Sequence, residues 1–169
     1  AANPTAKLVQ VDAVSYTGII QANQNSFGKA VVPHYQFDKA DVIVSFGADF
    51  LGTWISPVEF TRQYSANRGA ASLKNKKMSR HIQFETGMSL TGTNADARIA
   101  IKPSEEGIVL LNLYQALGGK VSAKKLANNP KADKAIQLAA RELANAKGKA
   151  LVVCGSNDVS SQIIVNAIN

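Results

Sequence analysis

Short apolar runs that alternate with helical segments constrain the fold of this chain more than any other feature of its sequence. The runs at 42–46, 81–85 and 150–154 have the length of buried strands, and helical patterns follow them at 57–67 and 131–147. Strands that are joined through helices run parallel, and right-handed crossovers place those helices on both sides of the sheet. The sequence therefore predicts an α/β fold, a three-layer sandwich in which helices flank a mostly parallel, Rossmann-like sheet.

Two further segments are expected before the first of these runs. Apolar residues within 8–14 (KLVQVDAV) predict an additional strand. A helix is expected to follow from Ser15, its N-cap, to about residue 25, and Gly28 lies just beyond its end.

The carboxyl-terminal half of the chain offers similar signals for helix starts. A short strand is expected at 98–101, and Ser104 is the expected N-cap of a helix over about 105–117. Asp158 is expected to cap the last helix, which follows the strand at 150–154. We expect residues 1–169 to form a single α/β domain cut from a longer chain, because the pattern ends within an apolar helix.

Composition excludes several classes of protein. The 169 residues are 46% hydrophobic and 18% charged, which is typical of a folded domain, and the apolar runs are shorter than the roughly 18 residues of a membrane span. We expect no direct membrane insertion. The net charge of +7 favours acidic partners, but the basic connector at 74–80 lacks interleaved aromatic residues, so we expect no nucleic acid partner. Cys154 is the only cysteine, which excludes an intrachain disulfide and a cluster held by several thiolates of this chain.

In parallel sheets ligands bind beyond the carboxyl ends of the strands. The loops that begin there are expected at Asp12, Gly47, Glu85, Lys102 and Gly155. The small residues after position 47 would let the backbone approach a phosphate closely, and the helix that starts in GSND (155–158) could bind an anion. Neither segment matches GxGxxG or a Walker A loop. We interpret these glycines as turn residues and leave a phosphate site as the alternative.

Other polar residues favour structural roles. Glu105 and Glu106 could act as an acid and base pair, but their position at a helix start favours a role in complementing the helix dipole. His34 and His81 are far apart in sequence, and we expect each at a strand edge or in a loop. No metal site is expected from this set.

Two long runs carry a resemblance to a known family. They are ADVIVSFGADFLGTWISPVEFTRQYSANR and MSRHIQFETGMSLTGTNADARIAIKPSEEG. They resemble the molybdopterin oxidoreductase family, and more closely the molybdopterin-oxidoreductase-like B subunit of bacterial alternative complex III. The resemblance covers roughly residues 7–118, and GKALVVCGSNDVSSQIIVNAIN is similar to the segment that follows in those proteins.

The resemblance implies a set of candidate cofactor-binding residues. In catalytic members a Gly-Ser-Asn-Pro loop with a downstream Thr holds one nucleotide arm of a molybdopterin guanine dinucleotide. Here Gly47 and Thr53 match this loop, while Asp49 stands at the Asn and Phe50 at the Pro. Glu85 stands at the acid of the family's Asp-Pro-Arg motif.

The later motifs of the family are matched in part. Thr91 or Thr93, with Asp96, resembles its Thr and Ala-Asp pattern, and Lys102 and Glu106 replace the Arg and final Asp of Ile-Arg-Pro-Gly-Thr-Asp-Gly. The candidate cofactor-binding residues, in part vestigial, are Gly47, Asp49, Thr53, Glu85, Thr91 and Lys102.

Three functions remain open at this point. The first, implied by the resemblance, is a non-catalytic scaffold domain of a redox subunit in a quinol-oxidising respiratory complex, on the periplasmic side of the cytoplasmic membrane. Its partners would be the rest of the parent subunit and neighbouring subunits, with no cofactor in this chain and iron–sulfur clusters elsewhere in the parent. The second is a pterin guanine dinucleotide-binding domain of an active molybdenum oxidoreductase, and the third is a small-molecule or nucleotide binder. The chain offers no catalytic residues for an oxidoreductase.

The run FLGTWISPVEF adds one expectation about packing. Its large apolar residues, Phe50, Leu51, Trp54, Ile55 and Phe60, could fill the crevice or form an exposed patch that meets a partner. We expect them to pack inward.

Overall fold

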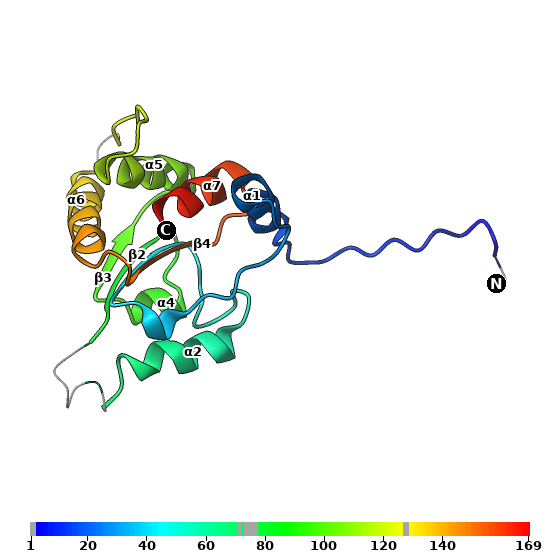
Figure 1. The fold of residues 1–169 in the computed structure, drawn as a ribbon, viewed down its shortest axis with the longest axis horizontal. Coiled ribbons are helices and arrows are strands. Elements are labelled where there is room, and N and C mark those ends of the chain that lie inside the picture. Colours follow the sequence, from blue (N-terminus) through cyan, green and yellow to red (C-terminus); the bar gives the residue numbers. More distant parts are fainter. Residues whose placement is uncertain (1–2, 71, 73–77, 127–128) are drawn as a thin grey trace.

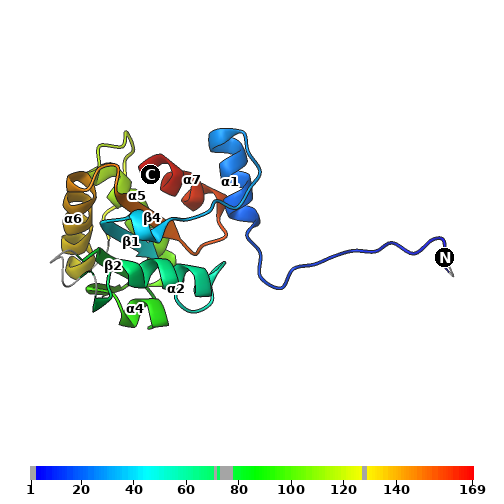
Figure 2. The same cartoon turned by 60° about the horizontal axis from the view of Figure 1, so that its bottom comes forward.

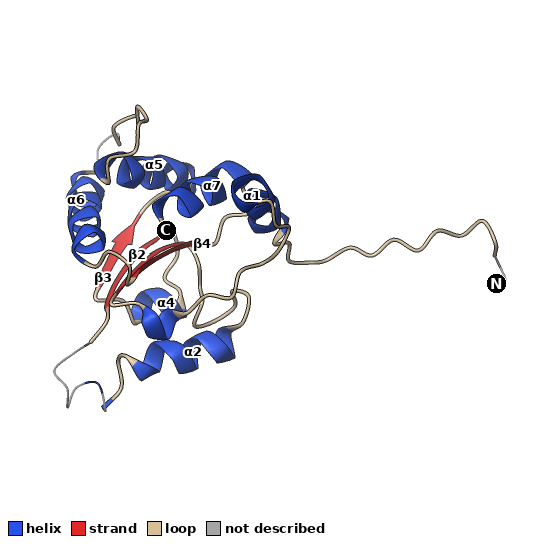
Figure 3. Cartoon of the chain, in the orientation of Figure 1, coloured by secondary structure: helices blue, strands red, loops and turns tan. Residues whose placement is uncertain are grey.

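A four-stranded, all-parallel sheet forms the centre of the protein (Figure 3). The computed structural model describes residues 3–70, 72, 78–126 and 129–169, and within these ranges the strand order is β3-β2-β1-β4. The strands are β1 (Val42–Phe46), β2 (Arg80–Glu85), β3 (Ala97–Ala100) and β4 (Ala150–Cys154). The predicted α/β fold class is confirmed, and the expected strands at 42–46, 81–85, 98–101 and 150–154 lie within one residue of those observed.

Helices cover both faces of the sheet (Figures 1 and 2). On one face lie α5 (Glu106–Ala116), α6 (Pro130–Asn145) and α7 (Val159–Ile168), and on the other lie α2 (Pro57–Ala66) and the short α4 (Leu90–Thr93). Helix α1 (Thr17–Phe27) packs beside α7, and 3-10 turns occupy Phe37–Lys39 and Pro103–Glu105. Among the described helices, none is long and apolar enough to cross a membrane.

The face under α5, α6 and α7 is apolar. Alternate residues of the strands point to it, among them Val44, Ile82 and Val152, and they contact Leu113 and Ile136 of the helices. The rings of Phe46 and Phe84, which are neighbours in the β1–β2 register, stack with centroids 5.0 Å apart. Burial of this surface is the main stabilising contribution on this side of the sheet.

An aromatic cluster fills the opposite face beside β1 and β4. It consists of Tyr35, Phe37, Phe50, Trp54, Phe60 and Tyr64. Trp54 is only 6% exposed and its ring centroid lies 5.0 Å from that of Tyr35. The inward packing predicted for the 50–60 run is therefore confirmed.

The turn after Trp54 places Ile55 at a φ of 56°, and the Ile55 N–H donates to the Tyr16 hydroxyl at 3.0 Å.

The predicted strand at 8–14 is wrong. Residues 3–14 form no strand and extend away from the body, with Leu8 fully exposed and Val11 84% exposed (Figure 1). Asp12 therefore does not lie at the carboxyl end of a strand. The side chain of Asn169 occupies the edge of β4 where a further strand would pair. Val152 N donates to Asn169 Oδ1 at 2.8 Å, and Asn169 Nδ2 donates to Val152 O at 2.9 Å.

Helix starts follow the predictions only in part. The Asp158 side chain caps α7 by accepting from Ser161 N at 2.8 Å, as expected, and Pro57 occupies the first turn of α2. Ser15 is not the N-cap of α1, since Tyr16 holds that position. Ser104 lies inside a 3-10 turn, where the Glu105 side chain accepts from Lys102 N. Most of the basic connector, residues 74–77, lies outside the described residues.

Candidate functional site

A cavity lies at the carboxyl end of the sheet, where the loops after all four strands meet. It has a volume of about 470 Å³. Its lining residues are Gly47 after β1, Thr86 after β2, Pro103, Glu106 and Gly107 after β3, and Gly155, Ser156, Asp158 and Ser161 after β4. This is the position at which doubly wound sheets bind ligands. The expectation that the loops after Phe46, Glu85 and β3 share one crevice is confirmed.

Two glycines allow these loops to approach one another. Gly47 has a φ of 59°, which favours glycine, and its N–H donates to Phe84 O at 2.8 Å. A Cβ on Gly155 would lie 2.6 Å from Gly47 O. The loops after β1 and β4 therefore touch through backbone, which supports the interpretation of these glycines as turn residues.

The electrostatics of the cavity are set by two carboxylates at helix starts. Helices α5 and α7 direct their amino-terminal turns at it, where Glu106 and Asp158 lie. Asp158 accepts from Ser161 N and, at 2.9 Å, from Ser161 Oγ. Burial raises the pKa of Glu106, which accepts from Cys154 Sγ at 3.4 Å. The described lining residues include no Lys or Arg, so the protein's own acids occupy the position that an anion would take.

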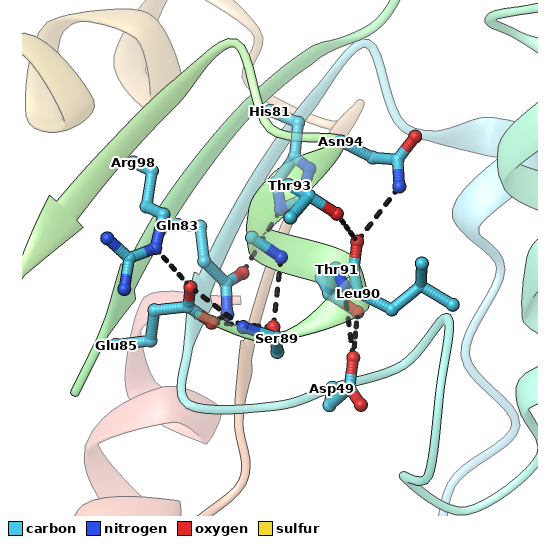
Figure 4. Close-up of polar contacts among 11 residues, drawn as sticks. Asp49, His81, Gln83, Glu85, Ser89, Leu90, Thr91, Thr93, Asn94 and Arg98 are labelled. Carbon is cyan, nitrogen blue, oxygen red and sulfur yellow. Dashed lines mark hydrogen bonds and ion pairs between the residues drawn. The ribbon is translucent and has the colours of Figure 1, made fainter. Parts of the chain in front are cut away.

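Asp49 is held by helix α4 and does not reach into the cavity lining. Its Oδ1 accepts from Thr91 N at 3.0 Å and from Thr91 Oγ1 at 2.8 Å (Figure 4). Thr91 Oγ1 in turn accepts from Leu51 N at 2.9 Å, and Thr53 Oγ1 lies 3.5 Å from the other carboxylate oxygen of Asp49. The structure thus brings Asp49, Thr53 and Thr91 together as a loop-to-helix contact.

Glu85 holds the start of the same helix through Ser89. It accepts from Ser89 N at 3.2 Å and Ser89 Oγ at 2.6 Å, and it forms an ion pair with Arg98 (Figure 4). Burial raises the pKa of Glu85, but the hydrogen bonds from Ser89 and the Arg98 guanidinium outweigh it and hold the pKa below its usual value. A Cβ on Gly92 would lie 1.9 Å from Glu85 Oε1, so a side chain at position 92 would displace the Glu85 carboxylate from this contact.

A buried row of polar side chains runs along β2 behind this contact. His81, Gln83 and Glu85 point to the same face, because side chains alternate along a strand, and all three are buried. Gln83 Nε2 donates to Glu85 Oε2 at 3.3 Å, which leaves Gln83 Oε1 to face His81 Nε2 at 3.2 Å. The Tyr64 hydroxyl lies 3.1 Å from His81 Nδ1. We call His81, Gln83 and Glu85 the polar row.

The polar row corrects one expectation and was missed by the sequence analysis. His81 lies inside β2 and is fully buried, not at a strand edge or in a loop, and burial lowers its pKa to about 4. His34 lies in a loop, as expected. The available signal was the alternation of polar residues at 81, 83 and 85 with apolar Ile82 and Phe84.

The remaining candidate residues lie apart from one another. Lys102 is exposed, and its backbone N–H donates to Glu105 Oε2 at 2.9 Å. Glu105 thus has the structural role expected for it. Gly47 lines the cavity, whereas Glu85 contacts Ser89 at the start of α4 and Asp49 contacts Thr91 within it. Within the described ranges, no group of three or more His, Cys, Asp or Glu could hold a metal ion.

The sequence was also compared with known proteins. No protein-family model matches the chain, and no curated protein matches it. The functional argument therefore rests on the fold and on the geometry of the site.

Proposed function

We propose that this chain is a non-catalytic scaffold domain of a molybdopterin-oxidoreductase-like subunit in a quinol-oxidising respiratory complex. The observation that carries the proposal is the double attachment of α4 by Asp49 and Glu85. These are the two acids at positions where the resemblance implies nucleotide contacts. Each accepts hydrogen bonds from α4 or the turn before it, so their role in this chain is to fix the loops to each other.

Electrostatics support the same proposal. A dinucleotide arm carries a pyrophosphate, and the cavity at the carboxyl end presents Glu106 and Asp158 without a lining Lys or Arg among the described residues. A carboxylate at contact distance from a phosphate costs about 1 to 4 kcal/mol in Coulomb energy, depending on the local dielectric. The residues present therefore do not fit a guanine dinucleotide.

The single cysteine also favours a scaffold over a catalyst. Burial, with a smaller contribution from the neighbouring Glu106, raises the pKa of the Cys154 thiol. A protonated, buried thiol is a poor nucleophile and a poor metal ligand. Electron transfer in the parent protein would then depend on iron–sulfur clusters outside this chain, and the domain would contact the rest of its subunit and neighbouring subunits on the periplasmic side of the membrane.

Calorimetric titration with GDP tests the absence of a nucleotide site. We expect no saturable heat for the 169-residue chain at millimolar GDP. The Asp49→Asn variant, which restores the neutral amide found in catalytic members, is expected to behave in the same way because the cavity acids remain. A dissociation constant below about 100 µM, equivalent to roughly 5.5 kcal/mol, for either protein would overturn the scaffold proposal in favour of the pterin-binding alternative.

Affinity purification from detergent-solubilised native membranes tests the assembly. The parent protein is expected to carry iron–sulfur clusters outside this domain and to co-purify with other subunits of the respiratory complex, and mass spectrometry of the complex is expected to find no pterin bound by this domain. Recovery of the parent protein by itself with a bound pterin would contradict the proposal.

A further inference from the structure

Positive charge is concentrated in one segment of the chain. Residues 119–149 contain eight Lys and Arg residues and two acidic ones, so they carry +6 of the net charge of +7. All eight basic residues are exposed. Five of them are lysines that lie between the end of α5 and the first turns of α6, and we call them the lysine cluster: Lys120, Lys124, Lys125, Lys131 and Lys134.

The fold holds the connection after α5 in place. Asn112 Nδ2 on α5 donates to Lys124 O at 2.8 Å, and Ala123 N donates to Gln115 Oε1 at 3.3 Å. Leu126, which follows the paired lysines, is buried in the apolar core. The lysines of the connection are therefore presented to solvent from a backbone that is fixed to the body of the domain.

Little negative charge lies close to the lysine cluster. Asp133 is the single acid within 117–134, and it lines a hollow of about 280 Å³ together with Lys125. No lysine of the cluster forms an ion pair with another described residue. Lys131 also lies in the first turn of α6, where the helix dipole disfavours a cation. The fold itself gains nothing from this charge, which favours an external anionic partner.

The composition of the cluster favours a lipid surface over a protein or a nucleic acid. Residues 117–134 contain five Lys but no Arg and no aromatic residue. Protein interfaces are enriched in Arg and aromatic residues and depleted in Lys. Nucleic acids are bound largely through Arg forks and through rings that stack on bases. A cluster of about four to eight basic residues without these features is typical of surfaces that attract anionic lipid headgroups.

The shape of this region also favours a flat partner. Figures 1 and 2 both show the connection after α5 projecting beyond the two helices. A projecting end can lie against a planar bilayer, whereas single-stranded nucleic acids are bound in positively charged grooves. The large apolar residues of the connection are withdrawn, since Val121 is half-buried and Leu126 is buried. Contact with a bilayer would therefore be electrostatic and would depend on salt.

We infer that the lysine cluster binds the anionic headgroups of a lipid bilayer. The inference uses only the charge and shape of this region, so it does not depend on the scaffold proposal. Co-sedimentation of the 169-residue chain with vesicles of phosphatidylglycerol and phosphatidylcholine in equal parts tests it. We expect saturable binding that pure phosphatidylcholine vesicles do not show. Binding is expected to be lost between about 0.1 M and about 1 M salt, because the Debye length shortens from about 10 Å to about 3 Å.

Removal of three charges from the cluster tests the residues themselves. The triple variant Lys120→Gln, Lys124→Gln and Lys125→Gln is expected to raise the dissociation constant for the anionic vesicles by about 100-fold, since each lysine near an anionic surface contributes about fivefold. All three side chains are exposed, so the variant is expected to keep its circular dichroism spectrum and its stability in urea.

The matched control removes the same charge elsewhere. Lys7, Lys29 and Lys39 are exposed and lie outside the cluster, and their triple substitution by Gln is expected to raise the dissociation constant by about threefold or less. Equal losses for the two triple variants would overturn the inference and assign the binding to net charge. An absence of binding to the anionic vesicles would also overturn it. Tighter binding to duplex DNA or to polyglutamate, at the same concentration of anionic groups, would overturn it in favour of a nucleic acid or an acidic protein.

Discussion

The two faces of strand β2 are both buried, yet they are stabilised in different ways. Ile82 and Phe84 lie in the apolar cluster with residues of α5 and α6, whereas His81, Gln83 and Glu85 are buried on the face of α2 and α4. The apolar face depends on buried area and shape, which are not directional. The polar row depends on each donor meeting its acceptor, because an unpaired buried polar group costs about 1 to 3 kcal/mol.

This comparison explains why the polar row is continuous. Its polar contacts run from Tyr64 through His81 and Gln83 to Glu85, which ends at Arg98 and Ser89. His81 is neutral near pH 7 because burial lowers its pKa, so it carries one ring proton. A ring proton on Nε2 can be donated to Gln83 Oε1. The Tyr64 hydroxyl, 3.1 Å from Nδ1, donates its single proton to Asn94 O at 3.0 Å.

The largest expected effect lies on the apolar face. Phe84→Ala removes a fully buried ring stacked on Phe46, and we expect the free energy of unfolding to fall by about 3 to 5 kcal/mol. Urea unfolding at pH 7 measures the change. Phe84→Met keeps most of the volume and is expected to lose less than half as much. Equal losses for the two variants would mean that this face is as dependent on specific geometry as the polar row.

The next effect is a pH dependence from His81. Its pKa is about 4 in the folded chain against an ordinary value of 6.5, so the unfolded chain binds the extra proton between these values. The contribution of the neutral His81 to the free energy of unfolding is therefore fully present above about pH 6.5. It is lost as pH falls towards 4, and the total loss is about 3 kcal/mol.

Urea unfolding of the unmodified chain and of His81→Gln at pH 7 and pH 4.5 measures this contribution as a difference between the two proteins. The subtraction removes the opposite contribution of Glu106, whose raised pKa favours the folded state at low pH. His34→Gln, at a histidine whose side chain is 63% exposed, is the control and is expected to retain the pH dependence. The same pH dependence in His81→Gln would contradict a buried neutral imidazole.

A smaller effect is expected at the end of the polar row. Glu85→Gln keeps the shape but places an amide N–H₂ against donors from Gln83, Ser89 or Arg98, and we expect a loss of about 1.5 to 3 kcal/mol in urea unfolding. Glu142→Gln, the same change on the half-buried surface of α6, is expected to stay within about 0.5 kcal/mol. If the two variants are equally stable, the charge of Glu85 does not fix α4.

The smallest effect distinguishes the two attachments of α4. Both hydrogen bonds from Thr91 reach a single oxygen of Asp49, so the amide oxygen of Asp49→Asn can accept them, and we expect a loss of about 1 kcal/mol or less. Asp49→Ala removes the acceptor and is expected to be clearly less stable than Asp49→Asn by the same measurement. The reverse order would show that Asp49 acts through its charge and not through its geometry.

Sequence patterns predicted the sheet well because its strands are apolar and short. The run VIVSF at 42–46 is buried throughout, and a strand buried on both faces has few other places to lie than the centre of a parallel sheet. The same criterion failed at 8–14. The sequence around Leu8 and Val11 is apolar like that of a strand, but both side chains are exposed and no strand lies beside them. It also placed His81 at an edge, since a lone histidine gives no indication of the tyrosine and glutamine that surround it.

The sequence by itself determined the alternation of strands and helices, the turn glycine at Gly47 and the cap at Asp158, because each depends on residues a few positions apart. Only the tertiary structure decided the roles of Asp49 and Glu85. Asp49 meets Thr91 across 42 positions, and Glu85 meets Arg98 from the neighbouring strand. A carboxylate has the same chemistry whether it faces a ligand or a helix, so its role is fixed by which donors the fold brings within hydrogen-bond distance.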